Sequence, residues 1–195
     1  MYPHTIDNGH GERLTFLGRD GDRLLVSSEV APGSGPPMHI HWQQTETMRV
    51  ESGRMGVAMP GVPDRFFGPG ELASFAPGVE HRFWNAADEP LHLVGEVFPA
   101  DNLEYFLSAV YASTAEHGGR PGALDAAFLL TRYRSEFAMT TIPSLVTRFV
   151  LPLQARIGRL LRRYDKFADA PDPVPGGAGA KLPRRSATSA RSSAG

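Results

Sequence analysis

GSGPPMHIHWQQTETMRVESG, residues 33–53, is the stretch from which the rest of the sequence can be interpreted. It places His39, His41 and Glu46 within eight residues. Two histidines separated by one residue project from the same face of a β-strand, because side chains alternate between its faces. Glu46 follows a short polar connection and can lie on a neighbouring strand beside them. Imidazole nitrogens and a carboxylate are ligands that divalent transition metals accept, so this stretch is a candidate metal site.

The composition of the 195-residue chain limits the classes of protein it can be. A formal net charge of -1 argues against a nucleic-acid partner. The absence of cysteine excludes disulfides, thiolate metal sites and cysteine nucleophiles, so a metal would have to be held by histidine and carboxylate. The sequence shows neither a secretory signal nor an apolar run long enough to cross a bilayer, and we therefore expect a cytoplasmic protein.

Short apolar runs separated by glycine and proline extend from Glu12 to Pro99 and predict a mainly β fold, a sandwich or small barrel. Residues 1–23 are expected to supply N-terminal strands that join a barrel formed by residues 24–100. The Arg19–Gly21 cluster predicts one hairpin, and the Gly53–Arg54 pair predicts a second, tight one.

The pattern changes at residue 101, and residues 101–168 are predicted to form C-terminal α-helices. The first helix begins after an N-cap at Asp101 or Asn102. The second covers residues 122–139, and the third covers residues 142–164 with an interruption near Pro152. Residues 169–195 are rich in Pro, Gly, Ala and Ser and are predicted to be a disordered tail.

A second informative stretch, GPGELASFAPGVEHRFWN at residues 68–85, places His81 after a Pro-Gly turn. If His81 converges on His39, His41 and Glu46, the result is a site with three imidazoles and one carboxylate. Such a site leaves one or two coordination positions open, as catalytic metal sites do.

The two stretches resemble the two motifs of the cupin superfamily. Gly33, His39, His41, Glu46 and Gly53 match the first motif, G-x5-H-x-H-x3,4-E-x6-G, at every spacing. The second motif is G-x5-P-x-G-x2-H-x3-N. Its matching residues are Gly70, Gly78, His81 and Asn85, and its departure is Ala76 in place of proline.

This resemblance implies a double-stranded β-helix, or jelly-roll, barrel that holds one divalent transition metal through His39, His41, Glu46 and His81. The family also implies a homodimer, because its members commonly pair. Fe, Mn, Ni, Co, Cu and Zn all suit this ligand set, and affinity order does not decide between them. Other cupins retain the ligands and bind sugars or act as scaffolds. The remaining histidines are expected to be structural or solvated: His4, His10, His92 and His117.

A divalent ion with one carboxylate leaves a net positive centre that favours an anionic substrate oxygen, such as that of an enolate, a carboxylate or a 1,3-dicarbonyl. Seven side chains near the motifs could form an apolar pocket or ordinary barrel core, and we favour core for most of them: Met38, Trp42, Met48, Met59, Phe75, Phe83 and Trp84.

Residues 144–164 form a basic amphipathic pattern. Six side chains share one side of the predicted helix: Leu145, Phe149, Leu153, Ile157, Leu160 and Tyr164. Five arginines are predicted on the opposite side: Arg148, Arg156, Arg159, Arg162 and Arg163. The apolar side could pack on the barrel or across a dimer, which we favour, or the segment from Arg148 to Tyr164 could contact an anionic membrane surface.

The sequence therefore favours a metal-dependent enzyme, a dioxygenase acting on a small oxygenated organic molecule, with Glu46 also the candidate catalytic base. Isomerisation or decarboxylation at the same centre is the nearest variant. The alternative is a non-catalytic module that binds a small ligand and uses its helical region for assembly or membrane contact.

Overall fold

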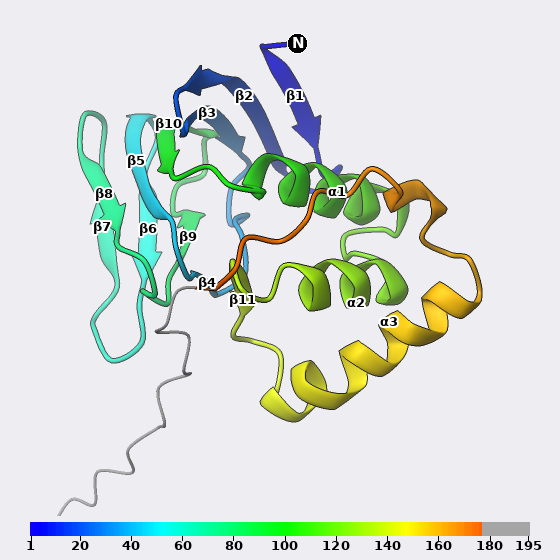
Figure 1. Ribbon diagram of the computed structural model, residues 1–195. Coiled ribbons are helices and arrows are strands. Elements are labelled where there is room, and N and C mark those ends of the chain that lie inside the picture. Colours follow the sequence, from blue (N-terminus) through cyan, green and yellow to red (C-terminus); the bar gives the residue numbers. More distant parts are fainter. Residues whose placement is uncertain (177–195) are drawn as a thin grey trace, which may run out of the picture.

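Antiparallel strands form a barrel beside a layer of helices in the computed structural model, which describes residues 1–176 (Figure 1). A six-stranded sheet has the order β1-β2-β3-β10-β5-β8, and a three-stranded sheet has the order β7-β6-β9. The strands of the barrel are β1 (His4–Asp7), β2 (Glu12–Asp20), β3 (Arg23–Val30), β4 (His39–His41), β5 (Thr45–Ser52), β6 (Met55–Ala58), β7 (Arg65–Phe67), β8 (Leu72–Phe75), β9 (Arg82–Asn85) and β10 (Leu91–Phe98). The predicted mainly β, jelly-roll barrel with C-terminal helices is confirmed.

Alternation along β5 determines what faces the barrel interior. Glu46, Met48 and Val50 are buried, whereas Arg49 between them is exposed. Because the period of a strand is two residues, the carboxylate of Glu46 shares the inner face with the apolar core. Met48, Phe75 and Phe83 are buried members of that core, as we expected for most of the apolar side chains near the motifs.

The two predicted hairpins have different outcomes. β2 and β3 pair on either side of Gly21, which has a positive φ of 57°, so the first hairpin is confirmed. The second is wrong, because β5 and β6 lie in different sheets. Gly53 instead turns the chain from one sheet to the other and has a positive φ of 87°. A Cβ added to Gly53 would lie 3.0 Å from the backbone of Leu91, so this position favours glycine.

The helical layer consists of α1 (Leu103–Glu116), α2 (Ala123–Arg132), a π-helical turn (Val146–Val150), α3 (Leu151–Leu160) and a 3-10 turn (Asp165–Phe167). The interruption predicted near Pro152 corresponds to the junction of the π-helical turn with α3. A second apolar core joins the helices to the six-stranded sheet through Phe16, Leu24, Val97, Phe106 and Tyr133.

The N-terminus of α1 is joined to the rest of the helical region by a buried carboxylate. Asn102 is the N-cap, as predicted, but its side chain makes no capping hydrogen bond. Instead, the backbone and side-chain amides of Asn102 donate to Glu136, which is fully buried. The backbone N–H of Val174 donates to the same carboxylate. Glu136 thereby satisfies donors that a helix N-terminus leaves open.

The second predicted helix is wrong at its C-terminal end. α2 stops at Arg132, and Phe137–Met139 form a short strand, β11, that pairs antiparallel with β4. Phe137 lies opposite His41, and Met139 lies opposite His39. The helical region therefore contributes a strand beside the predicted metal ligands, and Figure 1 shows β11 next to β4.

The predicted tail also begins too early. Arg132 donates to the backbone carbonyls of Ala170 and Pro171, and Tyr133 donates to Pro171. Ser135 donates to the carbonyl of Val174. These contacts hold residues 170–174 against the helical layer. The rest of the predicted tail, residues 177–195, lies outside the described residues.

Candidate metal centre

Two strands and the residue that precedes a third bring the four predicted ligands together. His39 and His41 are the two ends of β4, Glu46 is the second residue of β5, and His81 immediately precedes β9. His39 and His81 form an isolated antiparallel bridge, in which the backbone N–H of each donates to the carbonyl of the other at 2.9 and 3.0 Å. This pairing positions two imidazoles from opposite ends of the motif region side by side, with ring centroids 4.5 Å apart.

The donor atoms of the four side chains converge within 4.8 Å of one another. Nε2 of His81 lies 2.9 Å from Oε2 of Glu46, and Nε2 of His39 lies 3.1 Å from Nε2 of His41. Nε2 of His41 lies 3.6 Å from the same oxygen of Glu46. Ligands about 2.1 Å from one shared ion are separated by comparable distances. All four side chains are buried.

The contacts of the outer nitrogens, Nδ1, determine the tautomer of two imidazoles. Nδ1 of His39 lies 2.8 Å from the carbonyl of Pro37, and Nδ1 of His81 lies 2.9 Å from the carbonyl of Val79. In a neutral ring the proton therefore resides on Nδ1, and the lone pair of Nε2 points to the centre. A backbone carbonyl in this position is the usual outer partner of a metal-ligating histidine.

The same arrangement brings lone pairs together. Nε2 of His81 lies 2.9 Å from Oε2 of Glu46. With the proton on Nδ1, a lone pair of Nε2 faces the carboxylate and a shared cation would stabilise both, whereas a proton on Nε2 makes the hydrogen bond that lowers the pKa of Glu46. Nδ1 of His41 is buried without a hydrogen-bond partner among residues 1–176. The donor set therefore fits a metal ion better than a closed hydrogen-bond network of its own.

Burial controls the charge of the cluster. It lowers the pKa of His39, and it lowers that of His41 to about 4 even though Glu46 opposes the shift. Burial by itself raises the pKa of Glu46, but the hydrogen bond with His81 and the neighbouring imidazoles outweigh it and lower that pKa to about 2. Neutral His39 and His41 beside an ionised Glu46 form a donor set suited to a divalent cation.

Two aromatic rings form the apolar walls of the cluster. Phe75 of β8 stacks on His81, with centroids 3.8 Å apart and planes 8° apart. Phe137 of β11 contacts His41 edge-on, with centroids 5.5 Å apart. Sequence reasoning named Phe75 as a candidate but missed Phe137, which it placed in a helix. The signal available was the short SEFAM segment after α2, whose strand character depends on pairing with β4.

The other histidines do not join this site: His4, His10, His92 and His117 are all exposed. His117 has two acidic neighbours, Glu116 and Asp125, with donor atoms close enough for a second cluster. However, the amine of Lys166 lies 2.7 Å from Asp125 and 3.3 Å from Glu116, and it forms an ion pair with each carboxylate. The second cluster is therefore an ion-pair network.

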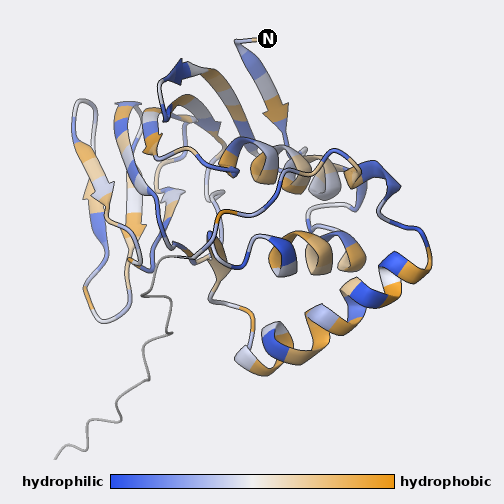
Figure 2. Ribbon diagram, viewed as in Figure 1, coloured by the Kyte–Doolittle hydropathy of each residue, from blue (hydrophilic) through white to orange (hydrophobic). Residues whose placement is uncertain are grey.

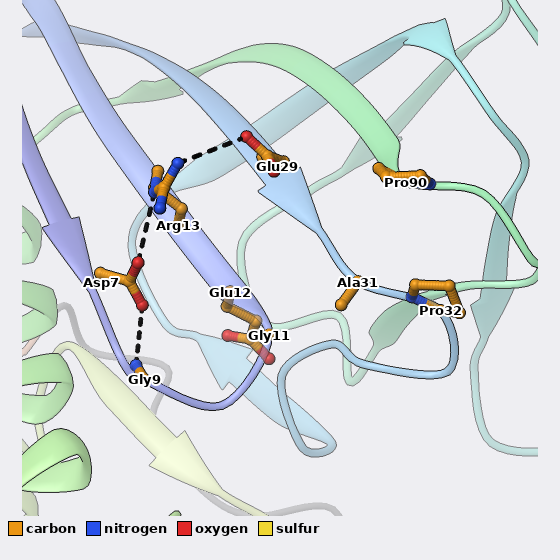
Figure 3. A pocket seen from close by; sticks show the side chains of 9 residues that line it. All are labelled: Asp7, Gly9, Gly11, Glu12, Arg13, Glu29, Ala31, Pro32 and Pro90. Atoms are coloured by element: carbon orange, nitrogen blue, oxygen red, sulfur yellow. Dashed lines mark hydrogen bonds and ion pairs between the residues drawn. The ribbon is translucent and has the colours of Figure 1, made fainter.

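Two surface pockets lie away from the four ligands. One, of about 330 Å³, is bordered by residues from β1, β2, β3 and the Ala31–Pro32 loop (Figure 3). In this pocket, the guanidinium of Arg13 lies 3.2 Å from the carboxylate of Asp7 and 3.8 Å from that of Glu29. Arg13 therefore has ion-pair partners within the protein. The other, of about 480 Å³, adjoins the Lys166 network. Neither pocket is lined by any of the four predicted metal-ligating residues.

An antiparallel β-barrel with three imidazoles and a glutamate inside it is typical of a cupin. Comparison with known families agrees, because residues 26–95 match the family model described as "Cupin domain". Residues 26–95 therefore form a domain of the cupin superfamily. Its buried His39, His41, Glu46 and His81 cluster suits a metal ion.

Curated relatives have oxidoreductase names. The chain is 31% identical over 103 residues to "Probable oxidoreductase virH" of Hypocrea virens, which covers 49% of this chain and 47% of that protein. It is 33% identical over 108 residues to "Probable oxidoreductase patJ" of Penicillium expansum, which covers 55% of this chain and 27% of that protein. The chain thus spans about half or less of the length of these relatives.

Among solved structures, the chain is similar to an RmlC-like cupin from Shewanella frigidimarina. The two are 21% identical with a TM-score of 0.45, and the match covers 51% of this chain and 86% of that one.

Proposed function

We propose that this protein is a mononuclear metal-dependent oxidoreductase that acts, in the manner of a dioxygenase, on a small organic molecule with an anionic oxygen. The observation that carries the proposal is the convergence of His39, His41, Glu46 and His81 at 2.9–3.6 Å within a buried, aromatic-walled site. The oxidoreductase names of the curated relatives support the same reaction class.

The chain would hold the metal through Nε2 of the three histidines and a carboxylate oxygen of Glu46. When bound, the ion would supply Lewis-acid and redox chemistry that joins an electron-rich carbon to O₂. In a dioxygenation, both oxygen atoms enter the organic product, so substrate and O₂ balance without an external reductant. A divalent ion held by three neutral imidazoles and one carboxylate would be a net positive centre, which selects an enolate or carboxylate oxygen.

The protein groups around the ligands would control access and protons. Phe75 and Phe137 limit water next to His81 and His41, which strengthens electrostatic interactions inside the site. Glu46 remains the candidate base, although a pKa of about 2 in the cluster makes it a weak one. Isomerisation or decarboxylation would use the same ligands and the same positive centre.

The test is anaerobic reconstitution with Fe(II), Mn(II), Ni(II), Co(II), Cu(II) or Zn(II), followed by O₂ consumption over a panel of flavonols, diketones and aromatic acids. We expect uptake with at least one metal and one substrate, and its loss in His81→Ala. The matched control is His92→Ala, because His92 is an exposed histidine on β10. Metal-loaded protein that consumes no O₂ with any substrate would contradict the dioxygenase proposal.

A second candidate is a non-catalytic ligand-binding or regulatory cupin. It is favoured by the pairing of β11 with β4, because a ligand at His39 or His41 would act on a strand hydrogen-bonded to the helical region. Tight binding of a panel compound without turnover, with a change in protease sensitivity of the helical region, would favour this candidate.

A further inference from the structure

The apolar side of α3 is exposed. α3 lies at the outer side of the helical layer, away from the barrel, and packs on α2 (Figure 1). The side that packs on α2 contains Leu151 and Gly158, which are buried. Tyr164 turns back over Gly158 and donates to the carbonyl of Leu124, so it does not belong to the apolar stripe. Of the two arrangements predicted for that stripe, packing on the barrel is therefore wrong, and packing across a dimer stays a prediction.

Large hydrophobic side chains gather on the face of α3 that points away from α2. Leu153, Ile157 and Leu160 follow one another at helical spacing and are 57%, 44% and 84% exposed. The preceding turn adds Leu145 and Phe149, which are 69% and 59% exposed. Half of the exposed large hydrophobics among the described residues lie in this one segment. Figure 2 shows hydrophobic and hydrophilic residues alternating along α3.

The same segment is strongly basic. Residues 142–164 contain no Asp or Glu and five exposed arginines: Arg148, Arg156, Arg159, Arg162 and Arg163. None of these arginines forms an ion pair or a side-chain hydrogen bond within the described part of the chain, residues 1–176. Residues 143–195 hold 10 of the chain's 20 basic residues and only three of its 21 acidic ones. The positive charge is therefore concentrated at one end of the sequence.

Charge complementarity decides what this face fits. In a symmetric contact between two copies, the five arginines of each chain would face those of the other, and like charges repel. An anionic lipid surface instead attracts each arginine while the apolar side chains enter the headgroup region. No helix within residues 1–176 is long and apolar enough to cross a bilayer.

We propose that α3, the turn before it and the two arginines after it, residues 145–163, form a docking surface for an anionic lipid bilayer. Leu153, Ile157 and Leu160 insert at the interface, and the arginines bind the headgroups. The helix lies along the membrane plane, with α2 and the barrel on its solvent side. This proposal does not depend on the chemistry of the metal centre.

The experiment is co-sedimentation of the full chain with vesicles of phosphatidylcholine, alone or with about a third phosphatidylserine. We expect binding to the anionic vesicles only, weakened at high salt. Changing Arg156, Arg159 and Arg163 to Gln should reduce the partition coefficient by about 100-fold, because each arginine near a charged surface contributes roughly fivefold. The matched control changes three exposed barrel arginines to Gln: Arg49, Arg65 and Arg82.

A second variant tests the apolar side. Changing Leu153, Ile157 and Leu160 to Gln should abolish vesicle binding, whereas changing the exposed barrel residues Leu17, Val62 and Leu72 to Gln should leave it intact. Circular dichroism would verify that each variant is folded. Absence of binding to anionic vesicles, or equal binding by the α3 variants and their controls, would overturn the proposal. The proposal would also be overturned if the wild type formed a dimer and bound no vesicles, and if the variant at Leu153, Ile157 and Leu160 were a monomer.

Discussion

Phe137 and His41 are directly opposite each other in the β11–β4 pair, and their rings meet edge to face at an interplanar angle of 84°. One residue comes from the helical region and the other from the first cupin motif. The backbone N–H of Trp42 donates to the carbonyl of Glu136 and extends the same connection. The helical region and the cluster of predicted metal ligands therefore share one packed wall.

Truncating Phe137 should destabilise the whole chain. Its side chain is only 3% exposed, and Phe137→Ala leaves a cavity beside His41 that costs about 3–5 kcal/mol of the free energy of unfolding. Urea denaturation would measure this loss. The control is Phe98→Ala, because Phe98 is 48% exposed and should change stability by less than about 1 kcal/mol. Equal losses for the two variants would contradict the shared wall.

Asn85 of the second motif has a structural role that can be separated from the metal. It is buried, donates to the carbonyls of Val30 and Glu89, and accepts from the N–H of Ala87. Asn85→Ala should lower the free energy of unfolding by about 1–3 kcal/mol, because it leaves buried polar groups unpaired.

Thermal denaturation and elemental analysis together would check the prediction for Asn85. The variant should retain the metal content of the wild type once folded, and the exposed loop variant Asp88→Ala should change neither quantity. Loss of metal from folded Asn85→Ala would show that Asn85 acts on the ligands.

Metal binding should stabilise the fold. An ion at about 100 times its Kd adds roughly 2.7 kcal/mol, which raises the Tm of a chain of this size by about 5–10 °C. A chelator should reverse the shift. In His81→Ala, the Tm should not respond to metal, and an unchanged response would place the binding site elsewhere.

The motifs predicted the convergence of the four side chains because local spacing determines it. His39 and His41 are two residues apart on one strand, Glu46 lies near the start of the next, and His81 follows a turn. Matching the spacing of the motifs was therefore sufficient to predict that these residues converge. The barrel was predicted for the same reason, from short runs between glycines and prolines. The hairpin predicted at Gly53 was wrong, because a tight turn can join strands within one sheet or between two.

Long-range pairing explains what the sequence did not reveal. β11 has three residues and no alternation of its own, and it exists because β4 offers it hydrogen bonds. Periodicity also identified the apolar stripe of α3 but not its surroundings. Leu151, Gly158 and Tyr164 pack on the rest of the helical layer, which leaves Leu153 and Leu160 exposed.

The most direct test of the central claim, that His39, His41, Glu46 and His81 bind one metal ion, is elemental analysis after anaerobic reconstitution and desalting. We predict one metal ion per chain in the wild type and in His92→Ala. The metal content of His41→Ala and of His81→Ala should each be lower than that of the wild type by about tenfold or more. A wild-type chain without metal, or His41→Ala with its full metal content, would contradict the claim.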